Sequence, residues 1–288
     1  MISDSTAGLG TWYGRQTSTD EVERAVLAAL AAGYRHIDTA FAYGCEPEIG
    51  SAIRASGIPR SEIFLTTKLT PSSLSRVEEG LTASLKNLGV DYIDLYLVHW
   101  PISVDPNDST KTTHPDWTFV DAWREMQKLP ASGRVRSIGV SNFQIEHLET
   151  LLSAPSTTVV PAVNQIELHP QCPSPKLVAY NASKGIHTTG YANLGGIPGK
   201  LREDPNVLDV MKSTGKSVAQ VLLKWGLQKE WSVIPKSSNE ERIRGNFDLD
   251  GWDLTEEEVK KLDGIEKRFR IYDGVGLFPE VSKFTDDE

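Results

Sequence analysis

Apolar and polar positions follow two recurring patterns along most of the chain. Short apolar runs rich in β-branched residues are typical of buried strands, and apolar residues spaced three and four apart are typical of amphipathic helices. The runs predict strands at 34–38, 63–68, 92–99, 135–140, 162–167, 186–191 and 232–234, and a short one near 247–249. The helical pattern covers 20–32, 46–55, 73–88, 119–131, 145–153, 175–184, 218–229 and a last helix from residue 240. Ser18 or Thr19 is the expected N-cap of the first helix.

Strands that alternate with helices predict a parallel sheet, and eight such units predict closure into a barrel. The fold class is therefore α/β, as a (β/α)8 TIM barrel. The chain has 288 residues, an ordinary size for one barrel. We expect a single domain over 1–288, with a C-terminal tail from about residue 270 over the rim.

An open doubly wound sheet is the competing architecture, and it would need a glycine-rich dinucleotide loop after a strand. The closest match is GLGTWYG at 8–14, which has the wrong third glycine spacing and no strand before it. We interpret this stretch as a turn leading into the first helix. The barrel is therefore favoured.

The charge balance narrows the possible partners. Asp and Glu number 39 against 30 Lys and Arg, giving a formal net charge of −9, which argues against nucleic-acid binding. The chain has no apolar run long enough to cross a membrane and no secretory signal pattern at MISDSTAG. We expect a soluble, cytoplasmic chain with no membrane partner.

Metal and disulfide chemistry is not indicated either. The 2 cysteines provide no disulfide framework and no metal-ligand cluster. Glu167 and His169 form a possible ligand pair, but without a third ligand we expect a structural role. No metal is predicted.

Four residues suggest the chemistry. Asp38, Lys68 and His99 end the first three predicted strands, and Tyr43 follows shortly after the first. The C-terminal strand ends of a barrel form one rim, where active sites are built. A carboxylate, an amine, an imidazole and a phenol gathered there could move a proton to or from a carbonyl oxygen.

Taken singly, each of the four residues also has an ordinary structural explanation. Tyr43 could be packing, Lys68 solvated and His99 a satisfied rim residue. Asp38 could cap the turn that follows it. Their joint placement favours the chemical interpretation.

Several motifs in order along the chain resemble those of the aldo-keto reductases. DTAFAYGCEPEIG at 38–50 matches one family pattern, Lys68 matches the family's lysine on the second strand, and LVHWP lies at 97–101. GVSNF, NQIELHP and IPKS follow at 139–143, 164–170 and 234–237. The resemblance covers about 8–254. Single motifs are weak, but their combination and order are specific.

The chemistry of a carbonyl reduction fits the same four residues. The hydride must come from a cofactor, because no side chain donates one. The proton can come from Tyr43, whose free pKa of about 10 we expect Lys68 to lower. Asp38 should hold Lys68 charged and in place, and His99 should orient the carbonyl. The resemblance implies these same roles.

Later strand ends predict a cofactor site. Ser141, Asn142 and Gln165 could hydrogen-bond a nicotinamide carboxamide, and Tyr191 could stack on its ring. The residues after the seventh strand offer two cations and a hydroxyl, which suit a 2′-phosphate and favour NADPH: Lys236, Ser237 and Arg242. The alternative for the two cations is a solvated surface. The resemblance adds Leu194 and the adenine-contacting Asn246.

The sequence departs from the family pattern at three places. Gly245 stands where the family usually has a glutamate near the adenine, and Ala192 replaces a serine that is expected to touch the pyrophosphate. The chain before Gly8 is too short for the N-terminal hairpin that usually closes the barrel floor. These departures predict weaker cofactor binding and a floor that is exposed or covered differently.

Substrate selection should come from aromatic residues and loops around the rim. The loops are 101–118, 192–206 and the tail. Aromatic side chains in or beside them form candidate walls of the pocket: Trp12, Phe41, Trp100 and Trp117.

The leading hypothesis is NADPH-dependent reduction of aldehydes, ketones or open-chain sugars to alcohols. The alternative is a cofactor-binding regulatory or sensor subunit with little turnover, as some relatives of this fold are. We expect a monomer or homodimer acting on a small-molecule carbonyl compound.

Overall fold

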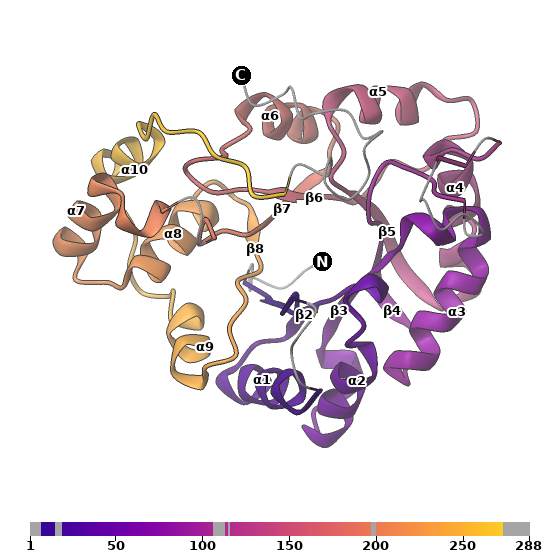
Figure 1. The fold of residues 1–288 in the computed structure, drawn as a ribbon, viewed down its shortest axis with the longest axis horizontal. Helices are drawn as coiled ribbons and strands as arrows, with labels where there is room; N and C mark the ends of the chain where they lie inside the picture. The colour runs from indigo at the N-terminus through magenta and orange to yellow at the C-terminus, as the bar shows by residue number, and fades with distance from the viewer. Residues whose placement is uncertain (1–6, 15–18, 106–112, 115, 197–199, 273–288) are drawn as a thin grey trace.

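The computed structural model describes residues 7–14, 19–105, 113–114, 116–196 and 200–272. Its centre is one parallel sheet of 8 strands in the order β1 to β8, with helices outside the ring of strands (Figure 1). The strands are β1 Leu9–Gly10, β2 His36–Asp38, β3 Phe64–Leu69, β4 Ile93–Val98, β5 Val135–Ser141, β6 Val163–Glu167, β7 His187–Tyr191 and β8 Ser232–Val233.

The last strand returns to the first, which closes the barrel. Ala7 forms a parallel bridge with Val233. The Gly8 backbone N–H donates to Val233 O (2.8 Å), and the Gly10 N–H donates to Pro235 O (3.0 Å). The predicted (β/α)8 barrel is confirmed.

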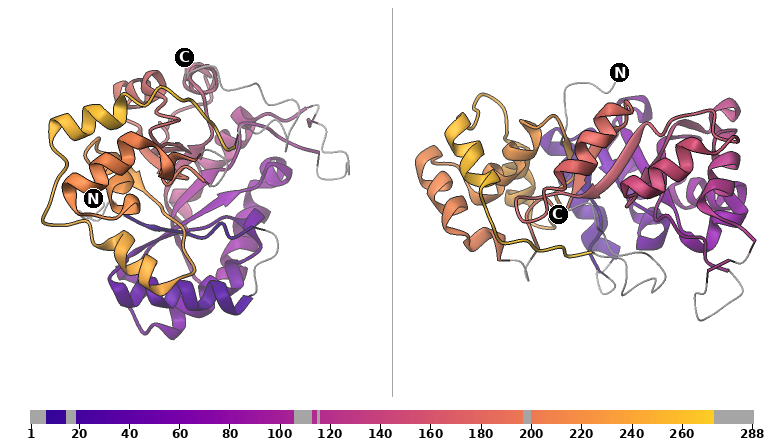
Figure 2. Two further views of the ribbon diagram at one scale, coloured as in Figure 1. Left: turned by 60° about the vertical axis from the view of Figure 1, so that its left-hand side comes forward. Right: turned by 90° about the horizontal axis from the view of Figure 1, so that it is seen from above.

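The helices cover the outside of the strands, as two further directions of view show (Figure 2). They are α1 Thr19–Ala32, α2 Glu46–Ala55, α3 Val77–Leu88, α4 Phe119–Met126, α5 Ile145–Ser153, α6 Pro175–Ser183, α7 Pro205–Thr214, α8 Val218–Leu227, α9 Glu240–Phe247 and α10 Glu256–Asp263. The short 3-10 helices are η1 Phe41–Tyr43, η2 Arg60–Glu62, η3 Pro71–Arg76, η4 Leu129–Ser132 and η5 Leu201–Glu203.

The position of one predicted strand was wrong. The strand missing from the prediction is β1, in the segment that we interpreted as a turn, whereas Phe247 ends α9 and no strand occupies 247–249. Two residues are too few to show a period-two pattern. Gly10 is needed there because a Cβ at this position would lie 2.5 Å from Ile234 O.

Several helix boundaries also differ from the prediction. α4 ends at Met126 because Pro130 lies in the following 3-10 turn η4. α1 begins at Thr19, so Thr19 is its first residue rather than its cap, and Ser18 lies outside the described residues.

Two helices, α7 and α10, were not predicted, although both carry start signals in the sequence. Asp204 caps α7 and is followed by Pro205. Thr255 and Glu258 form a capping box at the start of α10.

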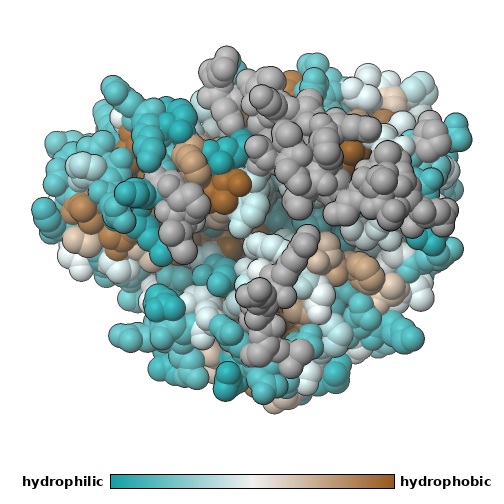
Figure 3. Space-filling view, viewed as in Figure 1, coloured by the Kyte–Doolittle hydropathy of each residue, from teal (hydrophilic) through white to brown (hydrophobic). Residues whose placement is uncertain are grey.

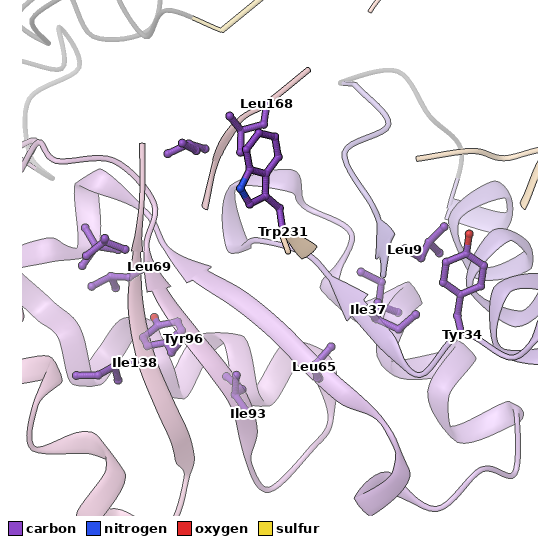
Figure 4. Close-up of a cluster of buried hydrophobic side chains, with 14 of the residues drawn as sticks. Leu9, Tyr34, Ile37, Leu65, Leu69, Ile93, Tyr96, Ile138, Leu168 and Trp231 are labelled. Atoms are coloured by element: carbon purple, nitrogen blue, oxygen red, sulfur yellow. The ribbon is translucent and has the colours of Figure 1, made fainter. Parts of the chain in front are cut away.

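The main hydrophobic core contains apolar side chains from both the strands and the helices around them. Leu9, Ile37, Leu65 and Ile93 contribute from successive strands (Figure 4). On the face of the molecule that Figure 3 shows, the surface of the outer helices is largely hydrophilic. Burial of this apolar layer fixes the strands, and with them the side chains at their C-terminal ends.

The floor of the barrel is only partly described. The question of an N-terminal hairpin falls on residues 1–6, which lie outside the described residues. At this end His36 Nε2 lies 3.1 Å from Thr66 Oγ1, and His187 Nε2 lies 2.8 Å from Ser232 Oγ.

Candidate active site

The four candidate residues meet at one end of the barrel. Asp38 is the last residue of β2, Lys68 lies near the end of β3, and His99 directly follows β4. Tyr43 ends the 3-10 turn η1, which returns the chain toward β3. Parallel strands place their C-terminal ends side by side, so residues far apart in sequence come together.

The Lys68 ammonium is the centre of the cluster. Its Nζ donates to Asp38 Oδ1 (2.6 Å), to Thr39 O (2.8 Å) and to Tyr43 Oη (3.4 Å). Burial alone would lower the pKa of Lys68, but the nearby Asp38 and Tyr43 outweigh it and raise the pKa above its ordinary value. Lys68 is therefore charged at neutral pH.

Asp38 is held on both sides. Its second oxygen, Oδ2, accepts from Gln165 Nε2 (2.6 Å), and the side chain is almost fully buried. The alternative role of Asp38 as a cap is wrong: the cap residue of η1 is Ala40, which has no side-chain capping bond. The carboxylate faces the site.

Tyr43 is a protonated phenol in this environment. Burial raises its pKa above the ordinary value, and the opposing effect of the Lys68 charge is smaller. The expectation that Lys68 lowers the Tyr43 pKa is thus correct for the direction of that one interaction but wrong for the net shift, because desolvation dominates. Tyr43 retains its proton and can donate it.

His99 is neutral. Burial, and then the Lys68 charge, lower the pKa of its imidazole well below the ordinary value. Its ring meets the Tyr43 ring edge to face, with centroids 5.6 Å apart. Nδ1 has no hydrogen-bond partner among the described residues. A neutral imidazole can donate a hydrogen bond to a carbonyl oxygen without competing with Tyr43 for the role of acid.

The predicted nicotinamide residues form a linked group at the ends of β5, β6 and β7. Asn142 Nδ2 donates to His99 O (2.9 Å), and Asn142 Oδ1 accepts from the Tyr191 hydroxyl (2.7 Å). The Ser141 hydroxyl donates to Gln165 O (2.8 Å). Asn142 has a left-handed φ of 64°, which asparagine tolerates. These hydrogen bonds connect the ends of β4 to β7 and place amide and hydroxyl groups beside the four candidate residues.

The predicted phosphate residues lie at the start of α9. Ser237 is buried, whereas Lys236 and Arg242 are exposed. No ion pair of these two cations is found among the described residues, and the neighbouring Glu240 accepts from Arg244. Two uncompensated cations near a helix N-terminus fit a phosphate group.

Tyr13 is a residue of this region that the sequence analysis missed. Its hydroxyl donates to Ser237 O (3.3 Å), and Lys236 Nζ lies 4.9 Å from the centre of its ring. A tyrosine in a glycine-rich segment carries no sequence signal for this role. Only closure of the barrel brings residue 13 beside residues 236 and 237.

The remaining cofactor positions are compatible with the prediction. Asn246 is buried in α9, and Leu194 is half-buried against the core. Ala192 has a left-handed φ of 53°. A Cβ at Gly245 would meet nothing within 4 Å, so the glycine is not required there for steric reasons.

The four residues predicted to be walls of the substrate pocket differ in their exposure. Trp12 and Phe41 are exposed at 36% and 38%, and the Trp12 ring lies 5.1 Å from the Tyr43 ring. Trp100 is buried with Ile102 and Val104. Trp12 and Phe41 thus present aromatic surface to solvent, Trp12 beside the Tyr43 ring, and their role as substrate walls stays a prediction.

Trp117 has a different setting. Its indole N–H donates to Leu74 O (2.8 Å). Its side chain lines a groove of about 590 Å³ outside the barrel, with residues of α3 and α4 such as Glu78 and Glu125. The contacts found for Trp117 give no support to a role as a substrate wall.

Comparisons with known proteins agree with this fold. The model of the aldo/keto reductase family matches residues 6–267. An aldo-keto reductase of Mycobacterium sp. (strain JLS) is 45% identical over 280 residues, covering 96% of this chain and 94% of the relative. Glycerol 2-dehydrogenase (NADP(+)) of Saccharomyces cerevisiae is 38% identical, covering 90% and 86%.

A solved structure, the aldose reductase of Schistosoma japonicum, superimposes with a TM-score of 0.88 at 35% identity, covering 98% of this chain and 95% of the other. The fold and these matches define an oxidoreductase built on a (β/α)8 barrel. The chain belongs to the aldo/keto reductase family. Among the described residues no helix is long and apolar enough to span a membrane.

Proposed function

We propose that the protein reduces aldehydes, ketones or open-chain sugars to alcohols with NADPH. The observation that carries the proposal is the buried ammonium of Lys68, joined to both Asp38 and the Tyr43 hydroxyl, with neutral His99 beside the phenol. This arrangement provides a proton donor and a charge that stabilises the donor after it has lost its proton.

When bound, NADPH supplies the hydride that the carbonyl carbon receives. Tyr43 gives its proton to the carbonyl oxygen, and the Lys68 ammonium stabilises the phenolate that remains. Asp38 and Gln165 keep Lys68 in position. His99 donates a hydrogen bond that orients the carbonyl oxygen toward Tyr43.

The residues that would hold the cofactor lie along the same rim. Ser141, Asn142 and Gln165 would hold the carboxamide, and Tyr191 would support the nicotinamide ring. Leu194 would contribute to the site between this end and α9. The phosphate and adenine would be held by four side chains: Lys236, Ser237, Arg242 and Asn246.

The preference for NADPH over NADH rests on charge. Lys236 and Arg242 have no carboxylate partner among the described residues, so a 2′-phosphate would supply the missing negative charge. Tyr13 supports this arrangement, because its ring lies under Lys236 and its hydroxyl holds the backbone at Ser237. The yeast relative is a glycerol 2-dehydrogenase (NADP(+)), which agrees with this choice.

A Tyr43→Phe variant tests the assignment of the acid. It should bind NADPH as the wild type does and lose reduction of a broad aldehyde panel by about 10²- to 10⁴-fold. Tyr180→Phe, on α6, is the matched control and should keep full activity. Near-normal activity of Tyr43→Phe would overturn the acid assignment. Tight NADPH binding by the wild type with negligible turnover on the whole panel would instead favour a regulatory or sensor subunit.

A further inference from the structure

Glu167 is a buried carboxylate that the proposed mechanism does not use. It ends β6, two residues after Gln165, and its side chain is fully buried. In an extended chain alternate residues point the same way, so Glu167 and His169 share a side while Leu168 packs into the core (Figure 4). A buried carboxylate must be satisfied by hydrogen bonds.

The C-terminal segment supplies those bonds. The Ile271 backbone N–H donates to Glu167 Oε1 (2.7 Å), and the Tyr272 N–H donates to Oε2 (2.8 Å). His169 Nε2 lies 3.0 Å from Oε1. Each carboxylate oxygen therefore receives one backbone amide of the same short stretch.

Neighbouring contacts fix the direction of this stretch. The Phe269 N–H donates to Gln171 O (2.9 Å), and Arg270 Nη2 donates to Ser174 Oγ (3.3 Å). The chain after α10 thus lies along the turn that follows β6, and Figure 1 shows it running from α10 to the ends of β6 and β7.

Tyr272 is thereby placed between two residues of the site. Its ring lies 5.9 Å from the Tyr191 ring, and the Trp12 side chain acts on its hydroxyl, partly opposing the burial that raises the pKa of Tyr272. Trp12 in turn contacts the Tyr43 ring. Tyr272 therefore lies between Trp12, two residues past the end of β1, and Tyr191, which ends β7.

We infer that Glu167 is a positioning residue that anchors the C-terminal segment through two backbone amides, and that this anchor makes Tyr272 a wall of the substrate pocket. The substrate part rests on the proposed carbonyl reduction. The wall selects for carbonyl compounds with a flat apolar group, because Trp12 and Tyr272 offer aromatic surface beside Tyr43.

The first test measures hydrogen exchange of the Ile271 and Tyr272 amides. Glu167→Gln loses one of the two acceptors, so these amides should exchange about 10- to 100-fold faster. Asp94→Asn is the matched control. Asp94 is also a buried carboxylate that accepts a backbone amide, from Leu65, but it lies at the start of β4. It should leave exchange at 271 and 272 unchanged. Unchanged exchange in Glu167→Gln would overturn the anchor.

The second test compares KM for benzaldehyde and for propanal. Glu167→Gln should raise the ratio of KM for benzaldehyde to KM for propanal about fivefold, because the aromatic substrate loses apolar contact. The effect on kcat should be smaller. Tyr272→Ala should raise the ratio equally, and the double variant should raise it no further. Asp94→Asn should leave the ratio as in the wild type. An unchanged ratio in both single variants would overturn the claim that Tyr272 is a wall of the pocket. If the double variant shows the product of the two single effects, the claim that Glu167 acts through Tyr272 is overturned.

Two further measurements distinguish a failure of this inference from a failure of the proposed function. Tyr272→Phe removes only the hydroxyl and keeps the ring that lies 5.9 Å from Tyr191, so it should raise the ratio by less than Tyr272→Ala, and this comparison does not depend on the folding of Glu167→Gln. Equal effects of the two Tyr272 variants would overturn the aromatic wall. If the wild type reduces neither aldehyde, the proposed function fails, whereas the exchange measurement still decides the anchor.

Discussion

Removal of the Lys68 ammonium should cost both stability and activity, by amounts that the structure allows us to work out. In Lys68→Met the Asp38 carboxylate loses the partner at 2.6 Å while both side chains are almost fully buried. Breaking a buried pair from one side costs about 3–5 kcal/mol. We expect the lower end, about 3 kcal/mol, because Gln165 still donates to Asp38 Oδ2.

The double variant Asp38→Asn/Lys68→Met isolates the charge. It removes both ions together, so its loss of unfolding free energy should be smaller than that of Lys68→Met alone, by about 2 kcal/mol. Chemical unfolding in urea measures both values. Lys229→Met is the matched control, since Lys229 pairs with Asp263 nearer the surface and should cost at most about 1 kcal/mol.

Activity provides the second measurement for the same change. Without the ammonium, the phenolate of Tyr43 loses its stabilising charge, and reduction should fall at least about 100-fold. If Lys68→Met loses no more stability than the double variant, the ammonium does not compensate Asp38 and the reasoning is refuted. A fall in stability without a fall in turnover would refute its role in the chemistry.

Three further changes have definite expected outcomes. Lys236→Ala or Arg242→Ala should weaken NADPH binding more than NADH binding, whereas Arg244→Ala, on the same helix, should not; equal weakening of both cofactors would remove the 2′-phosphate argument. A Cβ at position 245 meets nothing within 4 Å, so Gly245→Glu should bind NADPH about threefold tighter than Gly245→Ala, which controls for helix propensity; equal binding would show that no contact is restored. Burial lowers the pKa of His99, so as the pH falls this imidazole is protonated in the unfolded chain before it is protonated in the folded protein. The contribution of His99 to the free energy of unfolding is therefore fully present above about pH 6.5, and below that pH it falls by up to about 1.4 kcal/mol per pH unit. His99→Gln should reduce that slope in urea unfolding between pH 7 and 5, and an unchanged slope would contradict the neutral buried imidazole.

The family and the order of strands could be predicted because their signals are local. Asp38, Lys68 and His99 each end a strongly apolar run, and parallel strands necessarily bring those ends together. The same reasoning failed at β1, where two residues provide too short a pattern and the strand exists only because β8 and β2 flank it.

The electrostatics of the site depended on packing. The Lys68 charge acts on Tyr43 as expected, but the net shift of the phenol pKa is set by burial, and the extent of burial is a property of the assembled barrel. Gln165 illustrates the same point, because its side-chain nitrogen holds Asp38, a contact between residues that are distant in the sequence.

The sequence by itself determined the alternation of strands and helices and the barrel, and it pointed to Tyr43, Lys68 and His99 as candidate site residues, since each of these signals is encoded within a few neighbouring residues. Only the tertiary structure decided that Tyr13 supports Lys236 and that Glu167 receives the amides of residues 271 and 272. Such contacts join the first or last described segment to residues far away in the sequence. They depend on barrel closure and on satisfying buried polar groups, and no local pattern records either condition.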